Sequence, residues 1–333
     1  MSVFGEWYGV ARRLCTPVIL ALGMVACGGG TTQVERFVPA RLIVFGDDDS
    51  LIVNDGVNNG KKYTVNGVDA AQLRDCLLLP IWVQSLATYY NLVFAECNKG
   101  AATPLAFMRA KAGATVEHPG LGMAAQLASQ AAAGGAVTAG DMVVVMLGAN
   151  DLYALADRLQ AGTITNADAS TEARRLARVL AGQINTLLAT GARAIVSTVP
   201  DVGLSPYALA MNAAGSSAAS ARLSALVLDF NGTLRTSIDS TRFDGRNYGL
   251  VLADDVTQSM ARNAAVFGLT NVVAGVCAKL LPDCTSAAAD LIVVDGVAAN
   301  VAAYMWADTR HVSPAVHARI GEQATARASG NPF

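Results

Sequence analysis

The stretch Arg41-Leu-Ile-Val-Phe-Gly-Asp-Asp-Asp-Ser-Leu51 runs from a short apolar segment directly into an acidic turn. An apolar run of this length, without alternation of polar residues, is typical of a strand that is buried on both faces of a parallel sheet. In an open parallel sheet, ligands bind outside the carboxyl ends of the strands. We therefore expect the turn that begins at Gly46 to lie at a ligand site.

Further apolar runs follow along the chain, with helical patterns between them. The expected strands after the first cover residues 142–147, 194–198 and 248–252. The clearest helix has apolar side chains at helical spacing over residues 176–188 and Gly191 where it should end, and a second helix is expected over residues 81–94. Strands that alternate with helices predict an α/β fold with a mostly parallel sheet.

The N-terminus carries the pattern of an export signal. Two arginines precede an apolar run of 13 residues, 14–26, which is too short to span a bilayer and has the usual length of a signal-peptide core. Met24-Val-Ala-Cys27 resembles a bacterial lipobox, in which the cysteine is lipidated and becomes the first residue of the mature protein. We therefore expect residues 1–26 to be a signal peptide, 27–38 a lipidated tether and 39–333 a single domain with insertions.

The same pattern indicates where the protein resides. The residue after Cys27 is glycine, which by resemblance to such lipoproteins implies sorting to the outer membrane of a Gram-negative bacterium. The alternative is a plain secretory signal that is cut near Ala26 and leaves a periplasmic or secreted protein. With 24 basic against 26 acidic residues and no basic cluster, the chain lacks the electrostatic pattern of a nucleic-acid binder.

Four of the six cysteines lie beyond the leader and Cys27, and in an exported protein they favour disulfides. Proximity in sequence favours Cys76 with Cys97 and Cys277 with Cys284, although the sequence leaves the pairing open, and buried reduced thiols are the alternative. Neither a Cys-x-x-Cys pair nor His-Glu-x-x-His is present, and the acidic residues 47–60 lack the spacing of a calcium loop. We expect no metal and no cofactor.

The chain has three histidines, and one of them lies close to an aspartate. His317 follows a good helix cap, Ser313-Pro314, so we expect it on the surface of a helix. His311 falls on the loop that leads into this cap, three residues after Asp308. A serine hydroxyl attacks a carbonyl usefully when an imidazole takes its proton and a carboxylate holds that imidazole in place. The Asp308–His311 pair could supply both groups.

These residues resemble the blocks of the SGNH hydrolases, also called GDSL-type esterases and lipases. Phe45-Gly-Asp47 with Ser50-Leu51 is similar to the first block, Ala112-Gly-Ala114 to the second, Gly148-Ala-Asn-Asp151 to the third and Asp308-Thr-Arg-His311 to the last. The resemblance spans most of the mature chain, in the order and spacing of that family. It implies a three-layer α/β/α sandwich with a mostly parallel, flavodoxin-like sheet.

The resemblance also implies a function and a site. Ser50 would be the nucleophile, His311 the general base and Asp308 the residue that orients the imidazole. The oxyanion hole would consist of the backbone N–H of Ser50, the backbone N–H of Gly113 and the side-chain amide of Asn150. The substrate would be a small-molecule or lipid ester, and an acyltransferase on the same scaffold is an alternative.

One departure from the family lies at the nucleophile, where this chain has two more residues than the family's Gly-Asp-Ser. Without a gap, Asp48 takes the place of the serine, and the protein would be an inactive relative that acts as a binding module. If the turn bulges, Ser50 can face His311, with some of the carboxylates turned to solvent. We expect the second arrangement, because Asn150, Asp308 and His311 are all retained. The resulting prediction is an exported, membrane-anchored carboxylic ester hydrolase with a Ser-His-Asp triad.

Overall fold

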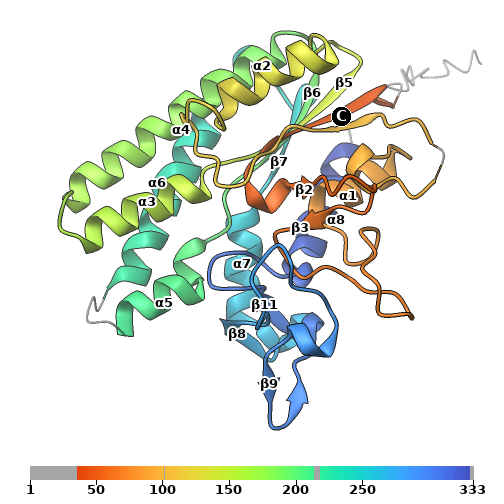
Figure 1. Ribbon diagram of the computed structural model, residues 1–333. Coiled ribbons are helices and arrows are strands. Elements are labelled where there is room, and N and C mark those ends of the chain that lie inside the picture. The colour runs from red at the N-terminus through yellow and green to blue at the C-terminus, as the bar shows by residue number, and fades with distance from the viewer. Residues whose placement is uncertain (1–35, 101, 214–217, 331–333) are drawn as a thin grey trace, which may run out of the picture. The chain divides into compact units, whose positions relative to one another are not determined.

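The computed structural model describes residues 36–100, 102–213 and 218–330, so the expected signal peptide and Cys27 lie outside the described residues. Within them, five parallel strands form the main sheet in the spatial order β4-β1-β5-β6-β7 (Figure 1). These strands are β1 (Arg41–Gly46), β4 (Ala106–Met108), β5 (Asp141–Met146), β6 (Arg193–Ser197) and β7 (Tyr248–Val251). Numbered along the chain, the order is 2-1-3-4-5, which is that of a flavodoxin-like sheet.

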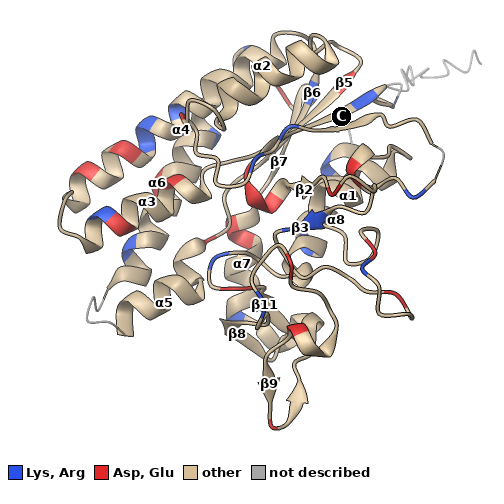
Figure 2. Cartoon of the chain, viewed as in Figure 1, with Lys and Arg blue, Asp and Glu red and all other residues tan. Residues whose placement is uncertain are grey.

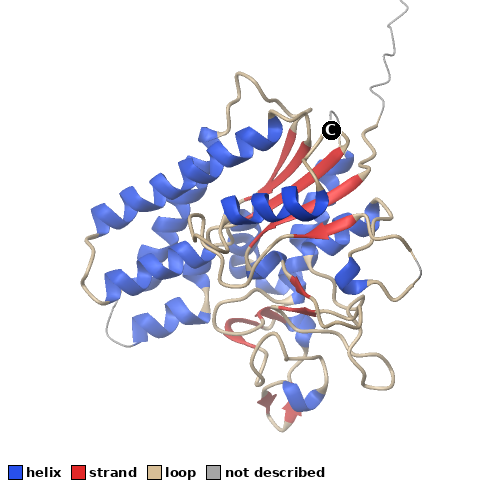
Figure 3. Ribbon diagram, turned by 45° about the horizontal axis from the view of Figure 1, so that its top comes forward, coloured by secondary structure: helices blue, strands red, loops and turns tan. Residues whose placement is uncertain are grey.

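Helices cover both faces of this sheet. Alternate residues of each strand face opposite ways, so each strand contributes side chains to two apolar cores. In β1, Ile43 and Phe45 belong to one apolar core, whereas Leu42 and Val44 belong to another. The first core also takes side chains from α2 (Met123–Gly134), α3 (Ala149–Gln160), α4 (Asn166–Leu188), α5 (Pro206–Ala213) and α6 (Ala219–Ser237). The second takes side chains from α1 (Trp82–Tyr89), α7 (Ala253–Arg262) and α8 (Pro314–Ser329). Figure 3 shows the sheet between these helices, which confirms the expected three-layer sandwich.

The expected strands are found within one or two residues of their predicted bounds, but β4 was missed because three residues are too few for a pattern. Helix α4 begins ten residues before the first leucine of the predicted pattern, where Thr165 caps it by accepting a hydrogen bond from the N–H of Asp168. Its first turns bury alanines rather than large side chains. Helix α1 ends at Tyr89 rather than at Phe94, and Asn91 just beyond it has a left-handed φ of 54°.

Insertions form a smaller region with an apolar core of its own. The parallel pair β8 (Asn271–Gly275) and β11 (Tyr304–Trp306) and the hairpin β9 (Val293–Val294) and β10 (Val297–Ala298) belong to this region, which is blue at the bottom of Figure 1. A further short pair, β2 (Ile52–Val53) and β3 (Lys61–Lys62), follows the acidic turn. Strand β11 ends two residues before Asp308, so this insertion positions the last sequence block.

Both expected disulfides are formed. Cys76 is bonded to Cys97 and Cys277 to Cys284, which is the pairing that sequence proximity favours. The first closes the segment that contains α1, and the second lies in the insertion between β8 and β11. None of the helices in the described part of the chain is both long and apolar enough to cross a membrane.

Helix α8 begins as the sequence predicts but buries a residue that the sequence placed outside. Ser313 accepts a hydrogen bond from the N–H of Ala315, and Pro314 opens the helix. His317, expected on the helix surface, is fully buried, and neither of its ring nitrogens has a hydrogen-bond partner among the described residues. The expectation was wrong because α8 packs against α1 as well as against the sheet, so more than one of its faces is covered.

Candidate active site

The acidic turn after β1 is a single turn of 3-10 helix, Asp48–Ser50, rather than a bulge. The N–H of Ser50 donates to the carbonyl of Asp47 at 3.1 Å, and the N–H of Leu51 donates to that of Asp48 at 3.1 Å. Successive side chains of a 3-10 helix are about 120° apart. Asp48, Asp49 and Ser50 therefore point in three different directions. Figure 2 shows this acidic turn as a red stretch of ribbon near the centre of the view.

Ser50 points into the interior. Its side chain is fully buried, and its Oγ accepts a hydrogen bond of 3.2 Å from the indole N–H of Trp82 on α1. The backbone N–H of Ser50 is already engaged by Asp47, so it is not an available oxyanion donor. The prediction that the turn would bring Ser50 to His311 is therefore wrong, because the turn follows the ungapped alternative.

Asp48 lies where the family resemblance puts the nucleophile. Its Oδ2 accepts hydrogen bonds from the backbone N–H of Gly113 at 2.9 Å and from the Nδ2 of Asn150 at 2.8 Å. Its Oδ1 lies 4.0 Å from the Nε2 of His311. The side chain keeps one tenth of its surface exposed, so solvent reaches the carboxylate. The expected site did not include Asp48, although the alternative alignment without a gap put it in the place of the serine.

The two donors to Asp48 follow β4 and β5, the strands on either side of β1. Gly113, after β4, has a φ of +69°, a conformation that glycine adopts without strain. A Cβ there would meet nothing within 4 Å, so the backbone conformation rather than space requires the glycine. Asn150 lies in the first turn of α3, directly after β5. The structure thus brings Gly113 and Asn150 together as expected, at the switch point of the sheet.

His311 and Asp308 form the expected pair on the loop after β11. The Nδ1 of His311 lies 2.9 Å from Oδ2 and 3.0 Å from Oδ1 of Asp308. Oδ1 also accepts the backbone N–H groups of Arg310 and His311, which fixes the carboxylate in place. Burial would raise the pKa of Asp308, but the hydrogen bond and the charge of His311 hold it below its ordinary value.

The imidazole of His311 lies in a strongly acidic environment. Burial alone would lower its pKa, but the hydrogen bond and charge of Asp308, followed by the charges of Asp49 and Asp48, raise the pKa of His311 to about 9. The ring is therefore protonated at neutral pH and faces a carboxylate on either side. The ring of Tyr63, whose centroid lies 5.5 Å away, covers part of it.

The other two carboxylates of the turn are buried rather than turned to solvent, contrary to expectation. Burial, followed by the charges of Asp49 and Asp48, raises the pKa of Asp47 well above its ordinary value. Burial also raises the pKa of Asp49 to about 7, against the opposing effect of His311. One oxygen of each has no hydrogen-bond partner within the described residues. Burial and mutual repulsion thus favour the neutral forms of Asp47 and Asp49.

A cluster of two tyrosines and one arginine, which the sequence did not single out, stabilises the loop that carries His311. The hydroxyl of Tyr153 on α3 donates to the carbonyl of Arg310 at 2.9 Å. The guanidinium of Arg310 lies over the rings of Tyr153 and Tyr207, 4.9 Å and 4.2 Å from their centroids. No local pattern marks this cluster, since its members come from three distant segments.

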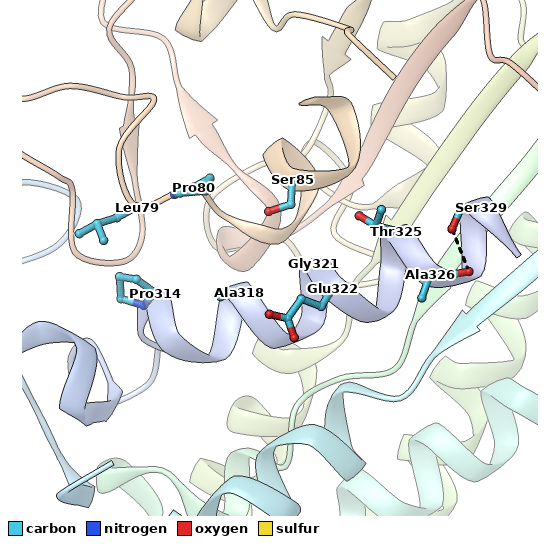
Figure 4. Close-up of a pocket in the computed structure, with 10 residues that line it drawn as sticks. All are labelled: Leu79, Pro80, Ser85, Pro314, Ala318, Gly321, Glu322, Thr325, Ala326 and Ser329. Carbon is cyan, nitrogen blue, oxygen red and sulfur yellow. Dashed lines mark hydrogen bonds between the residues drawn. The ribbon is translucent and has the colours of Figure 1, made fainter. Parts of the chain in front are cut away.

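Two other kinds of site do not coincide with these residues. In the part of the chain that the structure describes, no three His, Cys, Asp or Glu side chains are arranged to hold a metal ion. A groove of about 610 Å³ lies between α1 and α8, where Leu79, Ser85, Pro314 and Glu322 are among its lining residues (Figure 4). None of the residues around Asp48 and His311 lines this groove, so it is separate from the candidate site.

Comparisons with known proteins agree with this architecture. No curated protein matches the chain. The family model described as GDSL-like lipase/acylhydrolase matches residues 49–324, which is well over half of the 333 residues. This match confirms the resemblance that the sequence blocks carry, and it supports hydrolase activity in general. The chain belongs to the GDSL-like lipase/acylhydrolase family.

Proposed function

We propose that this protein is an exported hydrolase whose reacting groups are Asp48, His311 and Asp308. The observation that carries the proposal is the position of the Asp48 carboxylate, which takes both donors, Gly113 and Asn150, and faces the imidazole. Family membership supports hydrolysis, and small-molecule or lipid esters are the substrates that it implies. A carboxylate is itself a competent nucleophile in hydrolases, so the loss of the serine does not remove the chemistry.

A second candidate is a binding module without catalysis, and one observation favours it. Asp48 occupies the donors that would otherwise stabilise the oxyanion of a carboxylic ester, and such donors contribute on the order of 3 kcal/mol each to transition-state stabilisation. A serine-type mechanism therefore has neither its nucleophile nor its hole. The retained Asp308–His311 hydrogen bond favours the hydrolase instead, because a binding module has no use for an oriented imidazole.

The proposed hydrolase activity is tested by comparing the kcat/KM of His311→Ala with that of Ser50→Ala. The substrate panel contains p-nitrophenyl esters and two compounds with a leaving group on a saturated carbon, 1-bromohexane and 1,2-epoxyhexane. We expect His311→Ala to lower kcat/KM by about 10²- to 10⁴-fold, because the proton-transfer group is lost. Ser50→Ala should keep kcat/KM within about threefold. It should cost about 1–3 kcal/mol of stability, because the buried N–H of Trp82 loses its acceptor.

Three outcomes would separate the alternatives. Equal activity of His311→Ala and the unmodified protein would remove His311 from the mechanism. Loss of activity in a folded Ser50→Ala variant would restore the serine mechanism. No hydrolysis of any member of the panel by the unmodified protein would favour the binding module.

Export and lipid anchoring belong to the same proposal. Two disulfides support an oxidising compartment, and Cys27 is the residue that would carry the lipid. We expect an alkyne analogue of palmitate to label the full chain in a Gram-negative host and the protein to sediment with outer membranes. Cys27→Ser should be unlabelled and should appear in the periplasm. Equal labelling of both proteins, or an unlabelled mature chain that starts after Ala26, would contradict the anchor.

A further inference from the structure

We propose that Asp48 is a covalent nucleophile that takes an alkyl group from a saturated carbon bearing a leaving group, and that water activated by His311 then hydrolyses the resulting ester. This inference rests on the proposed function, a hydrolase that acts through Asp48, His311 and Asp308, but it replaces the esters that the family implies with alkyl electrophiles such as haloalkanes and epoxides. It differs from acyl transfer because the bond that breaks in the substrate lies at a saturated carbon.

The first support is that the two oxygens of Asp48 have different environments. Oδ2 is fixed by the N–H of Gly113 and the amide of Asn150, at 2.9 Å and 2.8 Å. Oδ1 accepts no hydrogen bond from the described residues and lies towards the imidazole of His311, 4.0 Å from Nε2. The donors orient the carboxylate, and one oxygen keeps its lone pairs for attack.

The second support is that this geometry opposes attack on an ordinary carboxylic ester. The donors that would stabilise a substrate oxyanion already hold Oδ2. A carboxylate is also a far better leaving group than an alkoxide, so a tetrahedral adduct of Asp48 with an alkyl ester would expel Asp48 again. At a saturated carbon, no oxyanion forms on the substrate, and a halide or a strained ring oxygen leaves readily.

The first step then needs no group that the site lacks. Oδ1 forms a bond to the carbon as the bond between that carbon and the leaving group breaks, and the leaving group departs with the electron pair. When the leaving group is an epoxide oxygen, it stays attached to the substrate and takes the proton from Nε2 of His311. The product is an alkyl ester of Asp48.

In the second step, the same two oxyanion donors act on the ester that Asp48 has formed. The carbonyl oxygen of that ester is Oδ2, which already lies against Gly113 and Asn150. Water gives a proton to Nε2 of His311 and attacks Cγ, and the negative charge develops on Oδ2, where the donors stabilise it. The bond between Cγ and Oδ1 then breaks, and the alcohol leaves with Oδ1 and a proton from His311. Overall, the alkyl electrophile and water give an alcohol and the protonated leaving group.

The charge of Asp48 links the two steps. Its carboxylate is one of the groups that keep His311 protonated, and esterification removes that charge. Loss of this charge lowers the pKa of His311. A ring that has not already given its proton to an epoxide oxygen therefore releases it to solvent more readily, and the neutral ring can then take a proton from water. Asp308 holds Nδ1 throughout, at 2.9 Å.

A trapping experiment tests the intermediate. His311→Gln is incubated with 1-bromohexane, because this variant can be alkylated but lacks the base for the second step. We expect intact mass to rise by one hexyl group and peptide mapping to place it on Asp48. The double variant Asp48→Asn/His311→Gln is the matched control and should gain nothing. Equal alkylation of both variants, or an adduct on another residue, would overturn the assignment.

Isotope transfer in the unmodified protein separates this inference from the broader proposal. In a single turnover of 1-bromohexane or 1,2-epoxyhexane in ¹⁸O-water, the label should appear in the peptide that contains Asp48 and not in the alcohol. Label in the alcohol alone, with activity that still depends on His311, would overturn the covalent step and leave the proposed function intact. The same holds if only p-nitrophenyl esters are hydrolysed. Activity that is indifferent to His311 on every substrate would instead defeat the proposed function.

Discussion

Replacement of Asp48 by asparagine is expected to lower kcat/KM for the best substrate of the panel by on the order of 10⁴- to 10⁶-fold, the loss typical of removing a nucleophile. The amide keeps the size of the side chain, but it loses both the charge and the reactive oxygen that faces His311. Because Asp48 and His311 act on the same intermediate, the double variant Asp48→Asn/His311→Ala should be little worse than either single variant. The measurement is steady-state hydrolysis of each variant.

The fold should survive this substitution. Asp48 is one of the charges that raise the pKa of its buried neighbour Asp47, so its removal relieves repulsion within the turn. We expect the free energy of unfolding at pH 7 to be unchanged or raised by about 1 kcal/mol, as is common where a site is optimised for function. Activity within tenfold of the unmodified protein would rule out Asp48 as a reacting group.

The variant Asp48→Ser tests whether this position supports acyl transfer. It returns a hydroxyl to the position that faces His311, and it releases Gly113 and Asn150 to bind a substrate oxygen. We expect it to hydrolyse p-nitrophenyl acetate at least about tenfold faster than Asp48→Asn, since the oxyanion donors become available. A variant no faster than Asp48→Asn would show that the position does not support acyl transfer.

Replacement of His317 by leucine is expected to make the protein markedly more resistant to acid. Burial, followed by the charges of Lys62 and His311, lowers the pKa of His317 to about 3 from an ordinary value of 6.5. Between these values, the unfolded chain binds a proton that the folded chain does not, so stability falls as the pH falls from 6.5 to 3. A pKa difference of this size corresponds to a loss of up to about 5 kcal/mol in the free energy of unfolding.

The test is the free energy of unfolding of both proteins from pH 7 to pH 4, measured with urea. The raised pKa values of Asp47 and Asp49 act in the opposite direction, because protonation in the folded state stabilises it as the pH falls. Both proteins share these groups, so the difference between their slopes isolates His317. At pH 7, the leucine variant should be at least as stable, since the imidazole has no partner. Parallel curves would show that His317 does not titrate in the unfolding reaction.

Much of the architecture follows from local patterns. The unbroken apolar run of β1 predicted a strand buried on both faces, and the strand lies between β4 and β5 in the parallel sheet. The helical spacing before Gly191 located α4, and Ser313-Pro314 located the start of α8. Asp308 and His311 are three residues apart, so the loop between them is short enough to bring their side chains together in many conformations.

The sequence by itself determined the parallel α/β fold, because strands and helices follow from residue type and period. Its resemblance to a family pointed to the three layers and to Gly113, Asn150, Asp308 and His311 as site residues, and it favoured the disulfide pairing that forms without deciding it. Only the tertiary structure decided which residue of the acidic turn meets the imidazole. A step of one residue in a 3-10 turn rotates the side chain by about 120°. That rotation is set by Trp82 holding Ser50 on one side and by Gly113 and Asn150 holding Asp48 on the other. These contacts join segments far apart in the chain, as does the packing that buries His317, and no local pattern encodes them.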